Sequence, residues 1–417
     1  MANYTSQELI ELENQYGAHN YHPLPVVLER GQGVYAWDVE GKKYFDFLSA
    51  YSAVNQGHCH PRIVEATKKQ AEKLCLTSRA FHNSELGKYE KLLAELMNMD
   101  RVLPMNSGAE AVETALKITR KWGYEKKGVP AEQGIIVVAN GNFHGRTTTI
   151  ISFSNDENAR EHFGPYTPGF ISVSYDDAEA LQKVLEENPN VVGFLVEPIQ
   201  GEAGVYVPKD GYLKACADLC KKHNVLFIAD EIQTGIARTG KMLACDHEGV
   251  KPDVLTLGKA LSGGFYPVSA VLAKDEVMEV LHPGQHGSTF GGNPLACAIA
   301  TEALQVVIDE KLAENADQMG IFFREEMQKI IDKHSDLVTL VRGKGLLNAI
   351  VINDTEDSDT AWELCLAMKE NGLLAKPTHG NIIRFAPPLV INKAQLTQCL
   401  EIIEKSIREF SKNDNKV

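Results

Sequence analysis

Two side chains that could carry out chemistry together each follow a short apolar segment. Asp230 ends the segment Val225-Leu-Phe-Ile-Ala-Asp230, and Lys259 ends the segment Val254-Leu-Thr-Leu-Gly-Lys259. Both segments are typical of buried parallel strands, so the two groups would meet at the sheet edge where open α/β folds bind ligands. An amine that forms a Schiff base with an aldehyde, and a carboxylate that keeps a pyridine nitrogen protonated, are what pyridoxal phosphate requires. Solvated surface charges at strand ends have the same pattern, so the pair alone leaves both interpretations open.

Composition narrows the classes of protein to consider. The chain has 417 residues, of which 44% are hydrophobic and 24% charged, enough to bury a large core and to form two domains. A formal net charge of −14 repels a polyanion, so we expect no nucleic-acid partner. The first ten residues resemble neither a transit peptide nor a signal peptide, and no apolar stretch has the length of a membrane span. We therefore expect a cytoplasmic protein without a membrane partner.

The cysteines and histidines do not predict a metal site. None of the eight cysteines lies in a Cys-x-x-Cys pair, which favours reduced thiols over disulfides or zinc. Cys216 and Cys220 are four residues apart, and we expect them to pack on one helix face. His58-Cys59-His60 could bind a metal, but neighbouring side chains in an extended loop point apart and no further ligand cluster lies nearby.

The elements that would position Asp230 and Lys259 follow an α/β order. Residues 33–46 alternate apolar and polar side chains around a Glu-Gly turn, which predicts an N-terminal hairpin. Between about residues 61 and 273, helical patterns such as 84–97 alternate with short apolar segments, which predicts a mostly parallel sheet covered by helices. The expected parallel strands are 135–139, 191–196, 225–229 and 254–257, and residues 266–273 are expected to return antiparallel.

A long helical pattern leads into the C-terminal region. It begins at Asn293 and runs to about residue 334, with a break near Glu310. Beyond it, strands are expected at 337–341, 346–352 and 382–385, and helices at 359–371 and 393–410. The polar residues 411–417 are expected to fray.

Two segments could hold a phosphate. Ser107 and the backbone amides after it precede the helical pattern 111–122, so they would form a helix N-terminus that attracts an anion. Ser288 and Thr289 begin a glycine-rich turn that leads into a helix and could donate hydrogen bonds to a phosphate. Ser107 could instead be only a helix cap, and the turn at Ser288 could instead be a hinge between domains.

A third segment, Gly141-Asn-Phe-His-Gly-Arg146, follows an expected strand. Phe143 could stack on a flat cofactor, and Arg146 could bind a carboxylate. A surface loop with a buried phenylalanine would look the same in sequence.

Taken together, these segments resemble the class III aminotransferases from about residue 16 to residue 390. Residues 226–235, LFIADEIQTG, and residues 256–264, TLGKALSGG, match the family's aspartate and lysine motifs in order and spacing. The resemblance implies that pyridoxal 5'-phosphate is the cofactor, attached to Lys259 and paired with Asp230. It also implies that Gly108 and Ala109 bind the phosphate, that Phe143 stacks on the pyridine ring, and that Gln233 contacts the ring hydroxyl.

The resemblance implies the type I fold of pyridoxal-phosphate enzymes. A large domain would contain a mostly parallel, seven-stranded sheet covered by helices, and a smaller α+β domain would be built from both termini. We predict an N-terminal segment at 1–50 that packs on the small domain, a large domain at 51–292 and a small domain at 293–417. The family also implies an obligate homodimer in which Thr289 completes the phosphate site of the neighbouring subunit.

Five positions bear on the substrate. Arg146 and Arg384 could each bind one carboxylate of a dicarboxylic keto acid. Glu202 resembles the family's switch residue, which pairs with the second arginine for a monocarboxylic donor and releases it for glutamate. A structural salt bridge would have the same sequence. Tyr21 and Tyr51 match the aromatic positions that orient the α-amino and α-carboxylate groups of ornithine.

The resemblance therefore implies transfer of the δ-amino group of L-ornithine to 2-oxoglutarate. The products would be L-glutamate and glutamate 5-semialdehyde, which cyclises to pyrroline-5-carboxylate. Acetylornithine or 4-aminobutyrate are alternative amine donors, and a glutamate-semialdehyde aminomutase would need no external keto acid. A binding protein that kept the fold but lost the chemistry is a further alternative, against which the retained Lys259, Asp230 and both arginines weigh.

Overall fold

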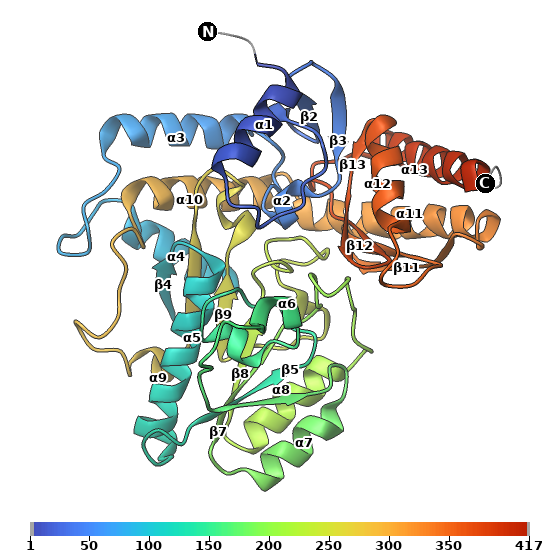
Figure 1. Ribbon diagram of the computed structural model, residues 1–417. Helices are drawn as coiled ribbons and strands as arrows, with labels where there is room; N and C mark the ends of the chain where they lie inside the picture. Colours follow the sequence, from blue (N-terminus) through green and yellow to red (C-terminus); the bar gives the residue numbers. More distant parts are fainter. Residues whose placement is uncertain (1–3, 415–417) are drawn as a thin grey trace.

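The computed structural model describes residues 4–414, and its centre is a seven-stranded sheet (Figure 1). The strand order is β4-β10-β9-β8-β7-β5-β6, and only β10 is antiparallel to its neighbours. The mostly parallel sheet and its antiparallel return are therefore confirmed. The strands are β4 (Arg101–Met105), β5 (Ile135–Ala139), β6 (Phe170–Val173), β7 (Val191–Val196), β8 (Leu226–Asp230), β9 (Val254–Leu257) and β10 (Ser269–Ala273).

The sequence patterns missed the two edge strands of this sheet, β4 and β6. Every residue of β7, β8 and β9 is buried, which produces the continuous apolar segments that identify them. The edge strands are only partly buried, and β4 contains Pro104, which a sheet tolerates at its edge. Their sequences consequently lack a clear strand pattern.

Helices cover both faces of the central sheet (Figure 1). The predicted break in the long helical pattern is confirmed, because one helix ends at Asp309 and the next begins at Leu312. No helix within residues 4–414 combines the length and the apolar character that a membrane span needs. The helices up to this break and just beyond it are α3 (Pro61–Lys73), α4 (Leu86–Met97), α5 (Gly108–Trp122), α6 (Glu157–Arg160), α7 (Ala178–Glu187), α8 (Tyr212–Lys222), α9 (Asp275–Met278), α10 (Pro294–Asp309) and α11 (Leu312–Lys333).

Segments from both ends of the chain share a second sheet of order β1-β2-β3-β13. The expected N-terminal hairpin is confirmed as an antiparallel pair of β2 and β3, and β13 from the C-terminal region pairs with β3 in parallel. The sequence patterns did not predict β1 or α1. The elements are α1 (Ser6–Tyr16), β1 (Leu28–Gln32), β2 (Tyr35–Asp38), β3 (Lys43–Asp46), α2 (Ser49–Ser52) and β13 (Leu373–Leu374).

A third sheet, of order β11-β12-β15-β14, belongs to the C-terminal region. Its elements are β11 (Val338–Lys344), β12 (Leu347–Ile352), β14 (Lys376–His379) and β15 (Ile382–Phe385), with helices α12 (Thr360–Glu370) and α13 (Lys393–Asp414). The expectation that the chain frays from residue 411 is wrong for residues 411–414, which continue α13, where the Ser411 hydroxyl donates to the Ile407 carbonyl. Residues 415–417 lie outside the described part. The predicted domain bounds at 50 and 292 stay predictions.

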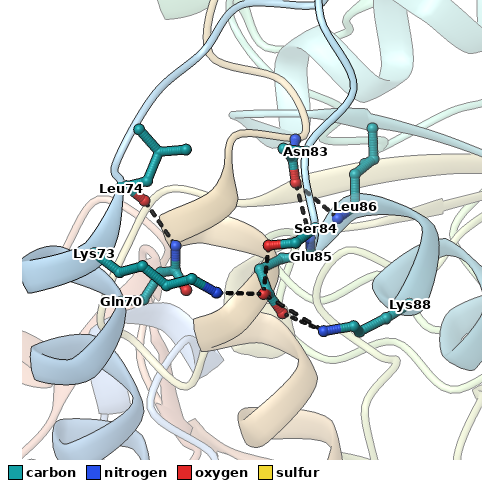
Figure 2. Close-up of polar contacts among 8 residues, drawn as sticks. All are labelled: Gln70, Lys73, Leu74, Asn83, Ser84, Glu85, Leu86 and Lys88. Carbon is teal, nitrogen blue, oxygen red and sulfur yellow. Dashed lines mark hydrogen bonds and ion pairs between the residues drawn. The ribbon is translucent and has the colours of Figure 1, made fainter.

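The loop between α3 and α4 is fixed at its base (Figure 2). Glu85 forms ion pairs with Lys73 of α3 at 3.4 Å and with Lys88 of α4 at 3.3 Å. Asn83 accepts hydrogen bonds from the backbone N–H groups that begin α4. Beyond this base, the loop carries Phe81, whose side chain is 70% exposed.

Two helical glycines have opposite surroundings. A Cβ added to Gly320 in α11 would lie 1.8 Å from the Gly345 carbonyl oxygen, whereas one added to Gly87 in α4 would meet no atom within 4 Å. Gly320→Ala is therefore expected to lower the free energy of unfolding by about 1–3 kcal/mol. Gly87→Ala is expected to raise it by about 0.5 kcal/mol. Urea denaturation measures both, and a neutral Gly320→Ala would contradict the close packing of α11 on the turn at Gly345.

Candidate active site

The parallel neighbours β8 and β9 bring Asp230 and Lys259 to one cavity. Asp230 is the last residue of β8 and lies opposite Thr256 of β9, and Lys259 follows two residues after β9 ends. Both side chains line a cavity of about 210 Å³. The predicted meeting of the two groups at the carboxyl edge of the sheet is confirmed.

Lys259 has a strained backbone, and the pKa of its amine is lowered. Its φ of 46° lies in the left-handed region, which is costly for a residue other than glycine and is typical of functional sites. Burial lowers the pKa of the amine to about 8, and the positive charge of Arg384 contributes in the same direction. A larger fraction of the amine is therefore neutral, and nucleophilic, than in an ordinary lysine.

Asp230 is buried and held by three hydrogen bonds. Its Oδ2 lies 2.6 Å from Nδ1 of His144, and its Oδ1 accepts from the Ile232 N–H at 3.1 Å and from the Thr256 hydroxyl at 3.2 Å. Burial disfavours the charged form of His144, but the hydrogen bond to Asp230 and its charge outweigh this and raise the pKa of the imidazole. These hydrogen bonds orient the Asp230 carboxylate where it lines the cavity, with His144 as one of its partners.

A second buried carboxylate, Glu197, joins two loops of the site. Its Oε1 accepts from the Phe143 N–H at 2.9 Å, and its Oε2 accepts from the Gly201 N–H at 3.2 Å. Burial raises the pKa of Glu197 to about 7. Glu197 therefore positions the backbone of the aromatic residue that lines the cavity and the backbone next to Glu202.

The N-terminus of α5 closes one end of the cavity. The Ser107 hydroxyl accepts from the Glu110 N–H at 3.2 Å, and the Glu110 carboxylate accepts from the Ser107 N–H at 3.0 Å, which completes a capping box. Gly108 and Ala109, the first residues of the helix, line the cavity. The capping box uses the N–H groups of Ser107 and Glu110, so the amides of Gly108 and Ala109 and the positive end of the helix dipole are available to an anion in the cavity.

The turn that carries Ser288 and Thr289 lies beside this helix start. The Ser288 hydroxyl accepts from the Asn106 side-chain amide at 2.7 Å. Neither Ser288 nor Thr289 lines the 210 Å³ cavity, and Thr289 is exposed. Within this single chain, these two predicted cofactor residues therefore stay outside the cavity.

Arg384 of β15 forms an ion pair at the edge of the cavity. The buried guanidinium donates through Nη1 to Glu202 Oε2 at 2.9 Å and to the Gly201 carbonyl at 3.0 Å, and Gln233 Oε1 lies 3.4 Å away. Burial opposes ionisation of Glu202, but the charge and hydrogen bond of Arg384 outweigh it and lower the pKa of that carboxyl. The Tyr51 ring centroid lies 5.3 Å from Cζ of Arg384.

Tyr21 and Arg146 lie farther out. Tyr21 is 73% exposed, yet it is near enough to Tyr51 to affect the pKa of that phenol, which is raised mainly by burial. Arg146 is exposed and lines a second cavity of about 610 Å³, which shares Phe143 and Glu202 with the first. Arg384 is therefore bonded to Glu202, whereas Arg146 shares only the lining of the second cavity with Glu202.

Comparison with known proteins agrees with this geometry. The family model described as aminotransferase class-III matches residues 16–407. The chain belongs to the class III aminotransferases. This class III aminotransferase is 62% identical to the mitochondrial ornithine aminotransferase of Drosophila melanogaster over 395 residues, which cover 95% of this chain and 90% of that protein.

Solved structures of other class III aminotransferases match nearly the whole chain. The ornithine aminotransferase of Toxoplasma gondii, with pyridoxal phosphate at partial occupancy in its active site, has a TM-score of 0.96 at 48% identity and covers 98% of this chain and 95% of its own. An acetylornithine aminotransferase of Elizabethkingia anophelis has a TM-score of 0.90 at 63% identity, with 98% and 100% covered. The N-acetylornithine aminotransferase of Stenotrophomonas maltophilia is 32% identical, with a TM-score of 0.82 and 97% and 100% covered.

Pyridoxal phosphate is the cofactor of this class III aminotransferase, and the cavity fits it. The cavity of about 210 Å³ is lined by the amine of Lys259, the carboxylate of Asp230, the ring of Phe143 and the helix N-terminus at Gly108. An added Cβ on Gly108 would come within 3.1 Å of Ile232, so glycine keeps this end of the cavity open. The individual roles of Phe143 and Gln233 toward the cofactor stay predictions.

Sequence reasoning missed three site residues of this class III aminotransferase. His144 and Thr256 bond to Asp230, and Glu197 bonds to the backbone of Phe143 and Gly201. His144 lies between Phe143 and Arg146 in the segment 141–146, and this position is the only indication of its role in the sequence. From the sequence, Glu197 follows a predicted strand and Thr256 lies inside one, so neither position indicates a site residue. Their contacts are visible only in the tertiary structure.

The lowered pKa of Lys259 predicts how the apoenzyme binds its cofactor. Because only the neutral amine attacks the aldehyde, the rate of covalent uptake of pyridoxal phosphate should rise with pH through about 8 and then level off. Rapid-mixing absorbance measures this rate. Arg384→Gln should move the midpoint upward, because it removes a positive charge that lowers the pKa. A wild-type rate that still rises toward 10.5, the ordinary lysine value, would contradict the assignment.

Proposed function

We propose that this aminotransferase acts on L-ornithine. It transfers the δ-amino group to 2-oxoglutarate and yields L-glutamate and glutamate 5-semialdehyde, which cyclises to pyrroline-5-carboxylate. The observation that carries the proposal is the ion pair of Glu202 and Arg384 at 2.9 Å beside the ring of Tyr51. Relatives described as ornithine aminotransferases at 62% identity support the same donor.

The ion pair explains how one site distinguishes two amine donors. Ornithine has a single carboxylate, and while Glu202 neutralises Arg384 that carboxylate gains little from Arg384. Tyr21 and Tyr51 then orient the α-amino and α-carboxylate groups, so that the distal amine reaches Lys259. Glutamate and 2-oxoglutarate have two carboxylates, which Arg146 and Arg384 bind once Glu202 turns away.

The chain's own groups then carry the proton and fix the ring. Pyridoxal phosphate, when bound, supplies an electrophilic aldehyde and an electron-accepting ring. Lys259 Nζ would hold the cofactor covalently, and its free amine would accept the proton from the δ-carbon of ornithine. Asp230, bonded to His144, would keep the pyridine nitrogen protonated. Phe143 would stack on the ring, Gln233 would bind its hydroxyl, and the amides of Gly108 and Ala109 would bind the phosphate.

N-acetylornithine is the second candidate donor, because the Elizabethkingia anophelis acetylornithine aminotransferase is 63% identical. Acetylation replaces the cationic α-amino group with a larger neutral amide, which no longer matches the contacts that we propose for Tyr21 and Tyr51. The Stenotrophomonas maltophilia N-acetylornithine aminotransferase is only 32% identical, which places this chain nearer the ornithine relatives than that enzyme. Ornithine is therefore favoured.

Turnover of four amine donors tests the proposal. With 2-oxoglutarate as acceptor, kcat/KM for ornithine should exceed those for N-acetylornithine, 4-aminobutyrate and lysine by at least about tenfold. Omission of 2-oxoglutarate should abolish turnover, whereas an aminomutase would not need it. A preference for any other donor would refute the ornithine proposal.

Glu202→Gln tests the ion pair separately. Loss of the negative charge leaves Arg384 free to bind a carboxylate, so kcat/KM for ornithine should fall by about tenfold while KM for glutamate falls or stays unchanged. Glu356→Gln is the matched control, because Glu356 lines the outer cavity but has no ion pair with Arg384 among residues 4–414. Equal losses for both donors in Glu202→Gln would argue against a switch.

We also propose a homodimer in which Thr289 reaches the phosphate site of the neighbouring subunit. Thr289 is exposed, and two exposed apolar side chains lie in adjoining loops, Phe290 at 46% and Phe81 at 70%. These loops contact each other, because the Asn83 side-chain amide donates to the Gly292 carbonyl at 3.2 Å. An apolar surface of this kind on two anchored loops is typical of a subunit interface.

A further inference from the structure

The turn that carries Tyr51 has an unusual backbone. Residues 49–52 have φ values of 48°, 48°, 59° and 69°, all in the left-handed region, and none of them is glycine. Left-handed turns of L-residues bring Cβ too close to the following carbonyl oxygen. Such a conformation persists only where the surroundings hold it in place. The position of the Tyr51 side chain therefore depends on whatever holds this turn.

Asp46 holds the start of the turn. Its Oδ1 accepts hydrogen bonds from the Leu48 N–H at 2.9 Å and from the Ser49 N–H at 2.8 Å. Its Oδ2 lies 2.7 Å from Nε2 of His58. Asp46 is buried, so the imidazole is the partner that orients its second oxygen.

His58 is itself fixed by the N-terminal sheet. Its backbone N–H and carbonyl pair with Gly33 at 2.8 Å and 2.9 Å. Its ring packs against Gly31 of β1 so closely that an added Cβ there would lie 2.7 Å from the imidazole. The ring is consequently directed at Asp46 by two neighbouring segments.

The same turn is connected to the strand that carries Arg384. The Phe47 carbonyl accepts from the Ala386 N–H at 2.7 Å, two residues beyond Arg384. Tyr51 and Arg384 thus extend from two backbones that are joined by this hydrogen bond and by a second one from the Leu389 N–H to the Asn55 carbonyl at 2.8 Å. A shift of the turn relative to Asp46 would move Tyr51 with respect to the ion pair of Glu202 and Arg384.

The two histidines of the segment 58–60 have separate partners. His60 Nε2 bonds to Glu310 at 2.9 Å, away from the Tyr51 turn, at the end of α10. His58 and His60 are thus similar histidine–carboxylate pairs in one loop, of which only one supports Tyr51. His60 therefore serves as a matched control.

We propose that Asp46 and His58 form a positioning pair that holds the left-handed Tyr51 turn and thereby determines how selectively the enzyme recognises the α groups of its amine donor. The pair touches neither donor nor cofactor. It rests on the proposed function in one respect, namely that Tyr51 contacts those α groups. Chemistry at Lys259 does not depend on the pair.

Three variants of the holoenzyme test the pair. His58→Asn places its amide where Nδ1 lies, short of Asp46, whereas His58→Gln can place a donor near the position of Nε2. His58→Asn should lower kcat/KM for ornithine by about tenfold, mostly through KM, and change the glutamate half-reaction much less. His58→Gln should recover most of the loss, and His60→Asn should resemble the wild type. Equal losses for ornithine and glutamate, or the same loss in His60→Asn, would overturn the proposal.

A double-mutant cycle asks whether His58 acts through Tyr51. If it does, His58→Asn should cost little further in a Tyr51→Phe background, and the two effects should be clearly non-additive. The same factor in both backgrounds would overturn the proposal. If the wild type prefers another donor, the ornithine proposal fails, and the cycle measured on that preferred donor decides the positioning pair separately.

Ala50→Gly provides an independent variant, which also serves where His58→Asn folds poorly. Glycine adopts a φ of 48° without the penalty of alanine, so this change removes part of the strain that the pair offsets. In the His58→Asn background it should raise the melting temperature and restore part of the selectivity for ornithine. Absence of any recovery in both measurements would contradict a role for the pair in holding a strained turn.

Discussion

The parallel pairing of β8 and β9 is the constraint on which the site depends. Their register sets Asp230 opposite Thr256, which donates to the carboxylate and lies just before the turn to Lys259. Because both strands are completely buried, a slip of the register would move every side chain to the opposite face and disrupt the packing of the core. The separation of amine and carboxylate is therefore set by the core of the protein, and the loops only complete the cavity around them.

Substrate selection is placed on different elements. Arg384 lies on a strand of the C-terminal sheet, Glu202 on a loop of the large sheet, and Tyr51 on a turn after the N-terminal sheet. Glu197 and Asp46 are the buried carboxylates that hold the backbones of these loops. The residues proposed for the chemistry and the residues proposed for donor recognition thus lie on separate elements.

Much of the fold could be predicted from the sequence, because buried parallel strands produce continuous apolar segments. Edge strands such as β4 did not have that pattern, since they are partly exposed and tolerate Pro104. The aspartate and lysine motifs were predictable because their residues are adjacent in sequence to the strands that position them. His144 and Glu197 were not, since each acts through a partner more than fifty residues away, Asp230 and Phe143 respectively. The left-handed turn at Tyr51 had no signal, because no glycine marks it.

We propose that Glu202 keeps Arg384 occupied while Tyr21 and Tyr51 orient the α groups of a monocarboxylic donor. A crystal structure of the enzyme with pyridoxal phosphate and an ornithine analogue blocked at the δ-carbon tests it most directly. We expect the α-carboxylate beside Tyr21 and Tyr51 and the distal amine beside Lys259. Glu202 and Arg384 should remain at hydrogen-bonding distance, as they are at 2.9 Å in the present structure. An α-carboxylate bound to Arg384, with Glu202 displaced, would contradict it.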